Sequence, residues 1–209
     1  MHVSFDVTSL LPKRVEESVA LQHDSEVASQ LLTGSPSIFI CDRGYSKYER
    51  MDSLQEENHF FVIRLKKNTV IQETQSLPSI DSHSNIVGDV MAYVGTDSVK
   101  TKNPFRIVSF VDLEGNIIHV ATNLPVKPEV IADLYRARWQ VELFFRWIKQ
   151  HLNVTRLFGT TPNAVYGQLY AALLAYALVQ WLYLHTRPAY CSISRIDFFR
   201  KLWLRELPA

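Results

Sequence analysis

The sequence predicts an α/β protein, and three segments carry this prediction. Residues 37–41 (SIFIC) form a compact apolar run of the buried-strand type. Residues 69–124 lack helical periodicity and alternate β-branched or aromatic runs with turn residues. Residues 128–152 contain no glycine, and no proline after the first position. Their apolar residues recur at three- and four-residue spacing, which predicts one long helix.

Composition favours a folded domain with a local positive charge. The 209 residues are 47% hydrophobic, enough to bury a substantial core in one domain or in one domain with an insertion. The net charge is only +1, yet residues 135–156 contain four Arg and one Lys against a single Glu. A basic helix in a neutral chain indicates a local anionic partner. The two cysteines, Cys41 and Cys191, follow no metal-binding spacing, so we expect a reducing cytoplasm and a buried Cys41.

Two tests for membrane or secretory segments give negative predictions. The first residues lack the basic and apolar regions of a signal peptide. Residues 164–184 are the only stretch long enough to resemble a membrane span, but Tyr166, Gln168, Tyr170, Tyr176 and Gln180 interrupt it. We therefore expect a mostly buried helix and no membrane partner.

The remaining elements follow from local patterns along the chain. Before residue 69 these are a hairpin of residues 1–7 and 13–19 around a Leu-Pro turn, a helix over 26–32, a helix over 47–58 and a strand over 60–65. Later elements are strands at 90–94, 105–111 and 117–121, a helix over 163–186, and a helical tail over 190–209. Thr161 and Pro162 predict the start of the helix over 163–186, as N-cap and first helical residue.

Asp42 is the first candidate site residue. It directly follows the apolar run of residues 37–41, and ligands of open α/β sheets gather at the carboxyl ends of strands. Gly44 permits a sharp turn there. An Asp-Gly turn with no chemical role is the alternative interpretation.

A row of polar residues on the helix over 128–152 is the second candidate. A helix turns by about 100° per residue. Measured around the helix axis from Tyr135, Arg138 lies at about −60°, Glu142 at about −20° and Lys149 at about −40°. This stripe borders the apolar face. A carboxylate flanked by a phenol and cations is compatible with a metal ligand beside a phosphate-binding row. The alternative is an ordinary solvated salt-bridge ladder around Glu142.

These residues also resemble a known family. The pattern Tyr135-x2-Arg138-x3-Glu142-x6-Lys149 resembles the YREK signature of bacterial insertion-sequence transposases of the DDE type, insertion-sequence family 4. Residues 40–45 (ICDRGY) are similar to the strand that delivers the family's second catalytic Asp, and residues 61–67 (FVIRLKK) to the strand that follows. The segment 158–164 resembles the one between the two closing helices, so nearly the whole chain is covered.

The resemblance implies an RNase H-like fold, a mixed sheet flanked by helices with a β-rich insertion before the Glu-bearing helix. It divides the chain into a first part of the core (1–68), the insertion (69–125), the closing helices (126–188) and a C-terminal helical tail (189–209). The family's first catalytic Asp lies on the first core strand, upstream of the segment that residues 2–6 resemble, and Asp6 does not match it. We therefore expect this first strand to be missing and the chain to be the C-terminal portion of a catalytic domain.

The same resemblance implies a chemistry. Asp42 and Glu142 would be two of three carboxylates holding two Mg²⁺ or Mn²⁺ ions, while Tyr135, Arg138, Arg146 and Lys149 would bind DNA. Because two carboxylates do not easily neutralise two divalent ions, we expect this chain to have weak or no activity without the first Asp. The expected partners are double-stranded DNA, as terminal inverted repeats and target, and a second copy in a homodimer. The expected compartment is the bacterial cytoplasm, at the nucleoid. Two alternatives stay open: a catalytically inactive DNA-binding or dimerising transposase remnant, and an RNase H-like nuclease that cuts without joining.

Overall fold

The structure, a computed structural model, describes residues 1–17, 27, 30–32, 37–77, 84–152, 154, 156–186 and 197–198. The chain divides into two compact units, residues 1–3 with 15–139 and residues 4–14 with 140–209. The predicted helices over 26–32 and 190–209 fall mostly outside the described residues, as does Cys191.

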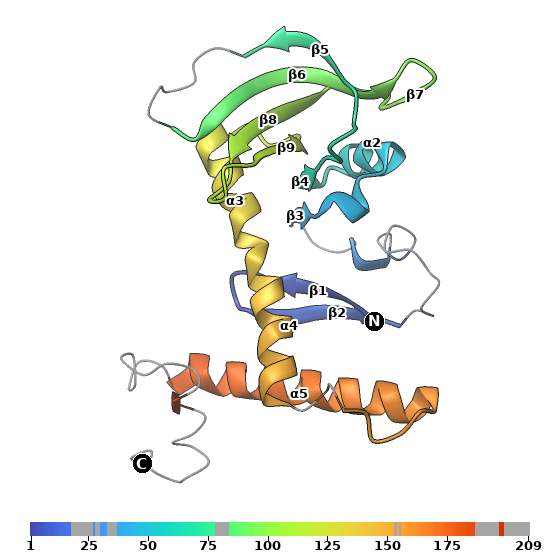
Figure 1. Ribbon diagram of the computed structural model, residues 1–209, viewed down its shortest axis with the longest axis vertical. Helices are drawn as coiled ribbons and strands as arrows, with labels where there is room; N and C mark the ends of the chain where they lie inside the picture. The colour runs from blue at the N-terminus through green and yellow to red at the C-terminus, as the bar shows by residue number, and fades with distance from the viewer. Residues whose placement is uncertain are drawn as a thin grey trace. The chain divides into compact units, whose positions relative to one another are not determined.

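A seven-stranded mixed sheet forms the centre of the first unit (Figure 1). Its main path runs β3-β4-β9-β8-β6-β5, and β7 pairs with β6. β3 and β4 are parallel, whereas the other pairs are antiparallel. The strands are β3 (Ile38–Cys41), β4 (Phe60–Arg64), β5 (Ile71–Ser76), β6 (Ile86–Thr96), β7 (Val99–Lys100), β8 (Phe105–Val111) and β9 (Ile117–Thr122).

The α/β prediction is confirmed, with a mixed sheet flanked by helices. The strands predicted at 90–94, 105–111 and 117–121 lie within β6, β8 and β9, while β5 and β7 were not anticipated. These strands continue the same sheet as β3 and β4, because β9 pairs with β4. The division of the chain into domains stays a prediction.

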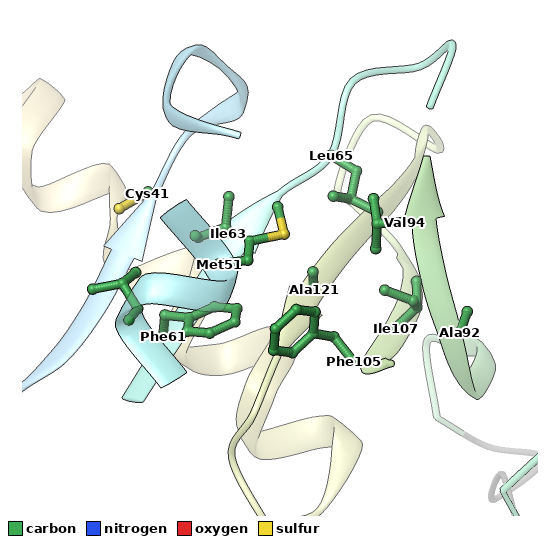
Figure 2. Close-up of a cluster of buried hydrophobic side chains, with 11 residues drawn as sticks. Cys41, Met51, Phe61, Ile63, Leu65, Ala92, Val94, Phe105, Ile107 and Ala121 are labelled. Atoms are coloured by element: carbon green, nitrogen blue, oxygen red, sulfur yellow. The ribbon is translucent and has the colours of Figure 1, made fainter. Parts of the chain in front are cut away.

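A helix covers each face of this sheet. The helix α2 (Tyr48–Glu56) packs Met51 and Leu54 against one face, in the cluster that Figure 2 shows. The helix α3 (Pro128–Ala137) packs on the other. Strand side chains alternate between faces, and β4 shows this directly. The buried strand residues on the α2 side include Phe61, Ile63, Phe105 and Ile107, and those on the α3 side include Val62, Val108, Phe110 and Val120.

The second unit is built on two helices. They are α4 (Trp139–His151), which enters this unit after its first residue, and α5 (Pro162–Thr186). Aromatic rings form its core, with Phe144 centred 4.7 Å from Tyr176 and 4.8 Å from Phe5. The Thr161 hydroxyl accepts a hydrogen bond from the backbone N–H of Ala164, and Pro162 is the first helical residue, so the predicted start of α5 is confirmed.

The N-terminal hairpin forms as predicted, from β1 (His2–Asp6) and β2 (Leu11–Glu16), but the predicted turn is wrong. The chain turns at residues 7–10, and the Leu-Pro pair lies in β2. Oδ1 of Asp6 accepts hydrogen bonds from the backbone N–H groups of Thr8 and Ser9, and an Asp side chain that bonds the backbone two residues on initiates a turn.

The single helix predicted over residues 128–152 is also wrong. The chain forms α3 and α4, interrupted at Arg138. The backbone N–H of Arg138 donates to the carbonyl of Tyr135, three residues back, which tightens the turn. Arg138 keeps right-handed helical dihedral angles (φ −53°, ψ −30°). Tyr135 therefore belongs to one helix and Glu142 to another.

The expectation that residues 164–184 are mostly buried is wrong for the described structure. Only 28% of the most apolar window of α5 is buried, and Leu174, Leu178 and Trp181 are exposed. Hydrophobic composition does not determine burial, because a helix buries only the face that its neighbours cover. By length and composition α5 could cross a membrane, a test that core helices of soluble proteins also pass.

A buried ion pair fixes the approach to α3. The Arg106 guanidinium donates to both carboxylate oxygens of Asp89, at 2.8 and 2.6 Å, and also to the backbone carbonyls of Leu124 and Val126. The Asp89 side chain is only 6% exposed. The short hydrogen bonds to Asp89 raise the pKa of Arg106.

Replacing Arg106 by Met should destabilise the fold strongly, because the Asp89 carboxylate stays buried without a partner. We expect the free energy of unfolding in urea, followed by circular dichroism, to fall by about 3–5 kcal/mol. Adding Asp89→Asn should recover part of this loss. The matched control is Arg136→Met, which removes an exposed ion pair with Asp133 and should cost less than about 1 kcal/mol. Equal small losses in the two variants would contradict the assignment.

Candidate active site

The parallel pairing of β3 with β4 places two polar residues at one edge of the sheet. The register aligns Ile40 with Val62 and Cys41 with Ile63. Cys41 and Ile63 lie in the cluster beneath α2. Because side chains alternate along a strand, the next residues, Asp42 and Arg64, leave on the α3 side.

The Asp42 carboxylate does not serve the turn in which the residue lies. Asp42 precedes a short 3₁₀ helix, η1 (Arg43–Tyr45), and its backbone carbonyl accepts from the N–H of Tyr45 at 3.0 Å. Its backbone is extended, and its side chain makes no capping hydrogen bond. An aspartate selected only for a turn would be expected to cap it. This geometry weighs against the interpretation of Asp42 as a turn residue alone.

One hydrogen bond and one longer ion pair meet at the same oxygen of that carboxylate. The Tyr135 hydroxyl donates to Oδ1 of Asp42 at 3.3 Å, and Nη1 of Arg64 lies 3.9 Å from the same oxygen. Neither of these two contacts uses Oδ2, and the Asp42 side chain is 40% exposed. The carboxylate is thus held on one side and accessible to a ligand.

Tyr135 is a buried donor. It is 5% exposed, and its ring lies 6.0 Å from that of Phe110 on β8. The Arg138 guanidinium lies 5.6 Å from the ring centre, within the range of a cation–π contact. Burial, and then the charge of Asp42, raise the pKa of Tyr135 against the opposing effects of Arg138 and Arg64. The phenol therefore stays protonated and able to donate at neutral pH.

The thiol of Cys41, the residue before Asp42, is unreactive. Cys41 is buried, as predicted, and burial raises the pKa of its thiol to about 12. A thiol that stays protonated is neither a nucleophile nor a metal ligand. The candidate chemistry at this edge therefore belongs to oxygen ligands.

The other candidates lie on α4, in the second unit. Glu142, Arg146 and Lys149 line an open hollow of about 550 Å³ together with Phe145 and Gln150. The spacing of four residues from Glu142 to Arg146, and of three from Arg146 to Lys149, keeps these three side chains on one side of the helix. Glu142 is half-buried, while Arg146 and Lys149 are exposed. The structure thus groups Asp42, Tyr135 and Arg138 in one unit, and Glu142, Arg146 and Lys149 in the other.

The side chains of the candidate site have the oxygen ligands that a hard divalent cation prefers. Carboxylate oxygens are the ligands that Mg²⁺ and Mn²⁺ prefer, and Asp42 and Glu142 both supply them. Within the described ranges, however, no group of three or more His, Cys, Asp or Glu side chains converges. The Asp6 carboxylate is already bound within the N-terminal hairpin. Burial raises its pKa, but hydrogen bonds from Thr8 and Ser9 and the charge of Lys13 outweigh that effect and lower it.

Sequence reasoning missed Arg64. A cation in the otherwise apolar strand FFVIR, at the end that lies beside Asp42, is the signal that could have found it. A buried strand accepts an Arg where its charge meets a partner. The first unit also contains a hollow of about 500 Å³, which is lined partly by His59, Arg106 and Asn123. We do not assign it to the candidate site, because the Arg106 guanidinium is already paired with Asp89.

Comparison with known proteins identifies the family. A family profile described as "Transposase DDE domain" matches residues 1–178. The chain is 43% identical, over its full length, to the probable transposase for insertion sequence element IS5377 of Geobacillus stearothermophilus, and covers 56% of that protein. It is 34% identical over 86% of its length to the putative transposase y4zB of Sinorhizobium fredii, covering 52% of it.

A more distant relative is the transposase InsG for insertion sequence element IS4 of Escherichia coli. The identity is 26%, over 87% of this chain and 43% of that protein. The chain thus spans about half the length of the curated relatives that it matches. The resemblance deduced from the Y-R-E-K spacing is confirmed: the chain belongs to the DDE-domain transposases of the insertion-sequence 4 type.

Proposed function

We propose that this chain supplies two metal-binding carboxylates of a transposase active site, Asp42 and Glu142, within an RNase H-like fold. One observation carries the proposal. Asp42 follows the end of a parallel strand, and its side chain makes no hydrogen bond that caps the turn there. Its carboxylate instead accepts a hydrogen bond from Tyr135, the first residue of the Y-R-E-K pattern. The third carboxylate of such a site would be a residue other than Asp6.

The chain's own residues would bind and orient the DNA. Arg138 and Arg146 suit bidentate contact with phosphate, whereas Lys149 supplies a point charge. Tyr135 and Arg64 would keep the Asp42 carboxylate in place. When bound, a pair of Mg²⁺ or Mn²⁺ ions supplies Lewis-acid activation of water and stabilisation of the leaving 3′ oxygen.

The proposed substrate is double-stranded DNA at the ends of an insertion sequence, followed by target DNA. The relatives are described as transposases of insertion sequences, which supports this assignment. The proposal includes a homodimer on DNA and a cytoplasmic location at the nucleoid. The exposed cations Arg146 and Lys149 support a DNA partner.

Binding of Mn²⁺ tests whether Asp42 and Glu142 share a cation. We expect Asp42→Asn and Glu142→Gln each to weaken Mn²⁺ affinity, measured by electron paramagnetic resonance of the free ion. If both ligate one ion, the double variant should lose less binding free energy than the sum of the two single losses. Fully additive losses would mean that the two carboxylates bind separate ions, and would contradict a shared site.

Glu142→Gln should abolish Mg²⁺-dependent nicking of DNA that carries the insertion-sequence end. We expect the rate to fall at least about 100-fold, because metal activation is worth several kcal/mol. Affinity for the same DNA in Ca²⁺ should change less than about twofold, since phosphate contacts rather than metal chemistry dominate it. The matched control is Glu114→Gln, which changes an exposed turn residue and should leave nicking intact.

The products of this assay separate the transposase from its alternatives. Joining of the cut 3′ end to target DNA supports transposition, whereas nicking without joining indicates a nuclease. End binding without any Mg²⁺-dependent cleavage by the unsubstituted chain would favour a DNA-binding remnant.

Lys149→Ala should weaken DNA binding uniformly across sequences. Loss of one phosphate contact should make the slope of log K against log salt shallower by about 0.9. Fluorescence anisotropy between low and physiological salt measures this slope. Lys102→Ala is the control, because Lys102 is exposed and pairs with Glu56. An unchanged slope in Lys149→Ala would show that Lys149 does not contact phosphate.

A further inference from the structure

Arg64 and Tyr135 reach Asp42 from two different elements. Arg64 comes from β4, the strand next to Asp42, and Tyr135 from the helix α3 above that face of the sheet. Both contacts meet at Oδ1. The Arg64 side chain is 25% exposed, so the Arg64 contact lies partly inside the protein.

A hydrogen bond and an ion pair on one carboxylate oxygen restrict the carboxylate more than either does alone. An aspartate side chain has only two rotatable bonds, so contacts from two directions limit the rotation of its carboxylate. Ligating carboxylates are commonly held in this way by hydrogen bonds from residues that do not touch the metal, and losing such a residue typically costs 10–100-fold in metal affinity.

We propose that Arg64 is a positioning residue which, together with Tyr135, holds Oδ1 of Asp42 so that Oδ2 is presented to the divalent cation. The inference rests on the proposed function, which makes Asp42 a metal ligand. It assigns a role to a residue outside the Y-R-E-K pattern, and it gives the single hydroxyl proton of Tyr135 to Asp42 instead of to a DNA phosphate.

Charge alone predicts the opposite result from positioning. The Arg64 guanidinium repels a cation bound at Asp42, so removing it would tighten metal binding if electrostatic repulsion were its main effect. The ion pair is long, at 3.9 Å, and both side chains are partly exposed, so solvent screens this repulsion. Orientation should therefore dominate, and loss of Arg64 should weaken the site.

The test measures Mn²⁺ binding to residues 1–209 by electron paramagnetic resonance of the free ion. We expect Arg64→Met to weaken Mn²⁺ affinity by about 10-fold, and Tyr135→Phe to act in the same direction. Lys67→Met is the matched control, because it removes an exposed positive charge three residues further along and should change affinity less than about twofold. Arg64→Gln replaces Arg64→Met if circular dichroism shows that the latter is unfolded, with the same expectation.

A second measurement separates positioning from direct DNA contact. In Ca²⁺, the salt dependence of DNA binding by Arg64→Met should match that of the unsubstituted chain, and a shallower slope would overturn the proposal in favour of a phosphate contact. Unchanged or tighter Mn²⁺ binding by a folded Arg64→Met would also overturn it, while leaving the proposed function intact. Mn²⁺ binding that is insensitive to Asp42→Asn would instead overturn the assignment of Asp42, and with it both proposals.

Discussion

The parallel pairing of β3 with β4 is the constraint on which the first part of the candidate site depends. Parallel strands end at the same edge, and alternation sends successive side chains to opposite faces. Once Cys41 and Ile63 are buried beneath α2, Asp42 and Arg64 must leave on the opposite side. A slip of one residue would exchange the two sets and bury the carboxylate under α2.

The position of Tyr135 depends on how α3 is held against that face. Ile131 and Ala132 of α3 are fully buried against the sheet, and their position determines which side of the helix carries Tyr135. The Arg106 guanidinium binds the carbonyls of Leu124 and Val126 just before the helix begins. The ion pair of Arg106 with Asp89 therefore contributes to the site although neither side chain contacts Asp42. Stability and site geometry share the same interactions here.

Local patterns in the sequence were enough to predict β3, α2, β4 and the start of α5, because apolar runs and capping residues act over a few positions. They were also enough to single out Asp42 at a strand end. The pairing of Asp42 with Arg64 could not be predicted in this way, since it depends on the register between strands about twenty residues apart. The exposed face of α5 depends similarly on tertiary packing rather than on composition. The interruption of the helix at Arg138 could not be predicted either, because no glycine or proline lies near it.

That interruption changes how the Y-R-E-K spacing should be understood. A uniform turn of about 100° per residue would place all four residues on one stripe, but the hydrogen-bond pattern shifts at Arg138. The four residues fall into two groups, one in each unit of the structure. In one, Tyr135 contacts Asp42 and carries Arg138 over its ring, and in the other Glu142 shares a hollow with Arg146 and Lys149. In the proposed function, Asp42 from the first group and Glu142 from the second would bind the same cation.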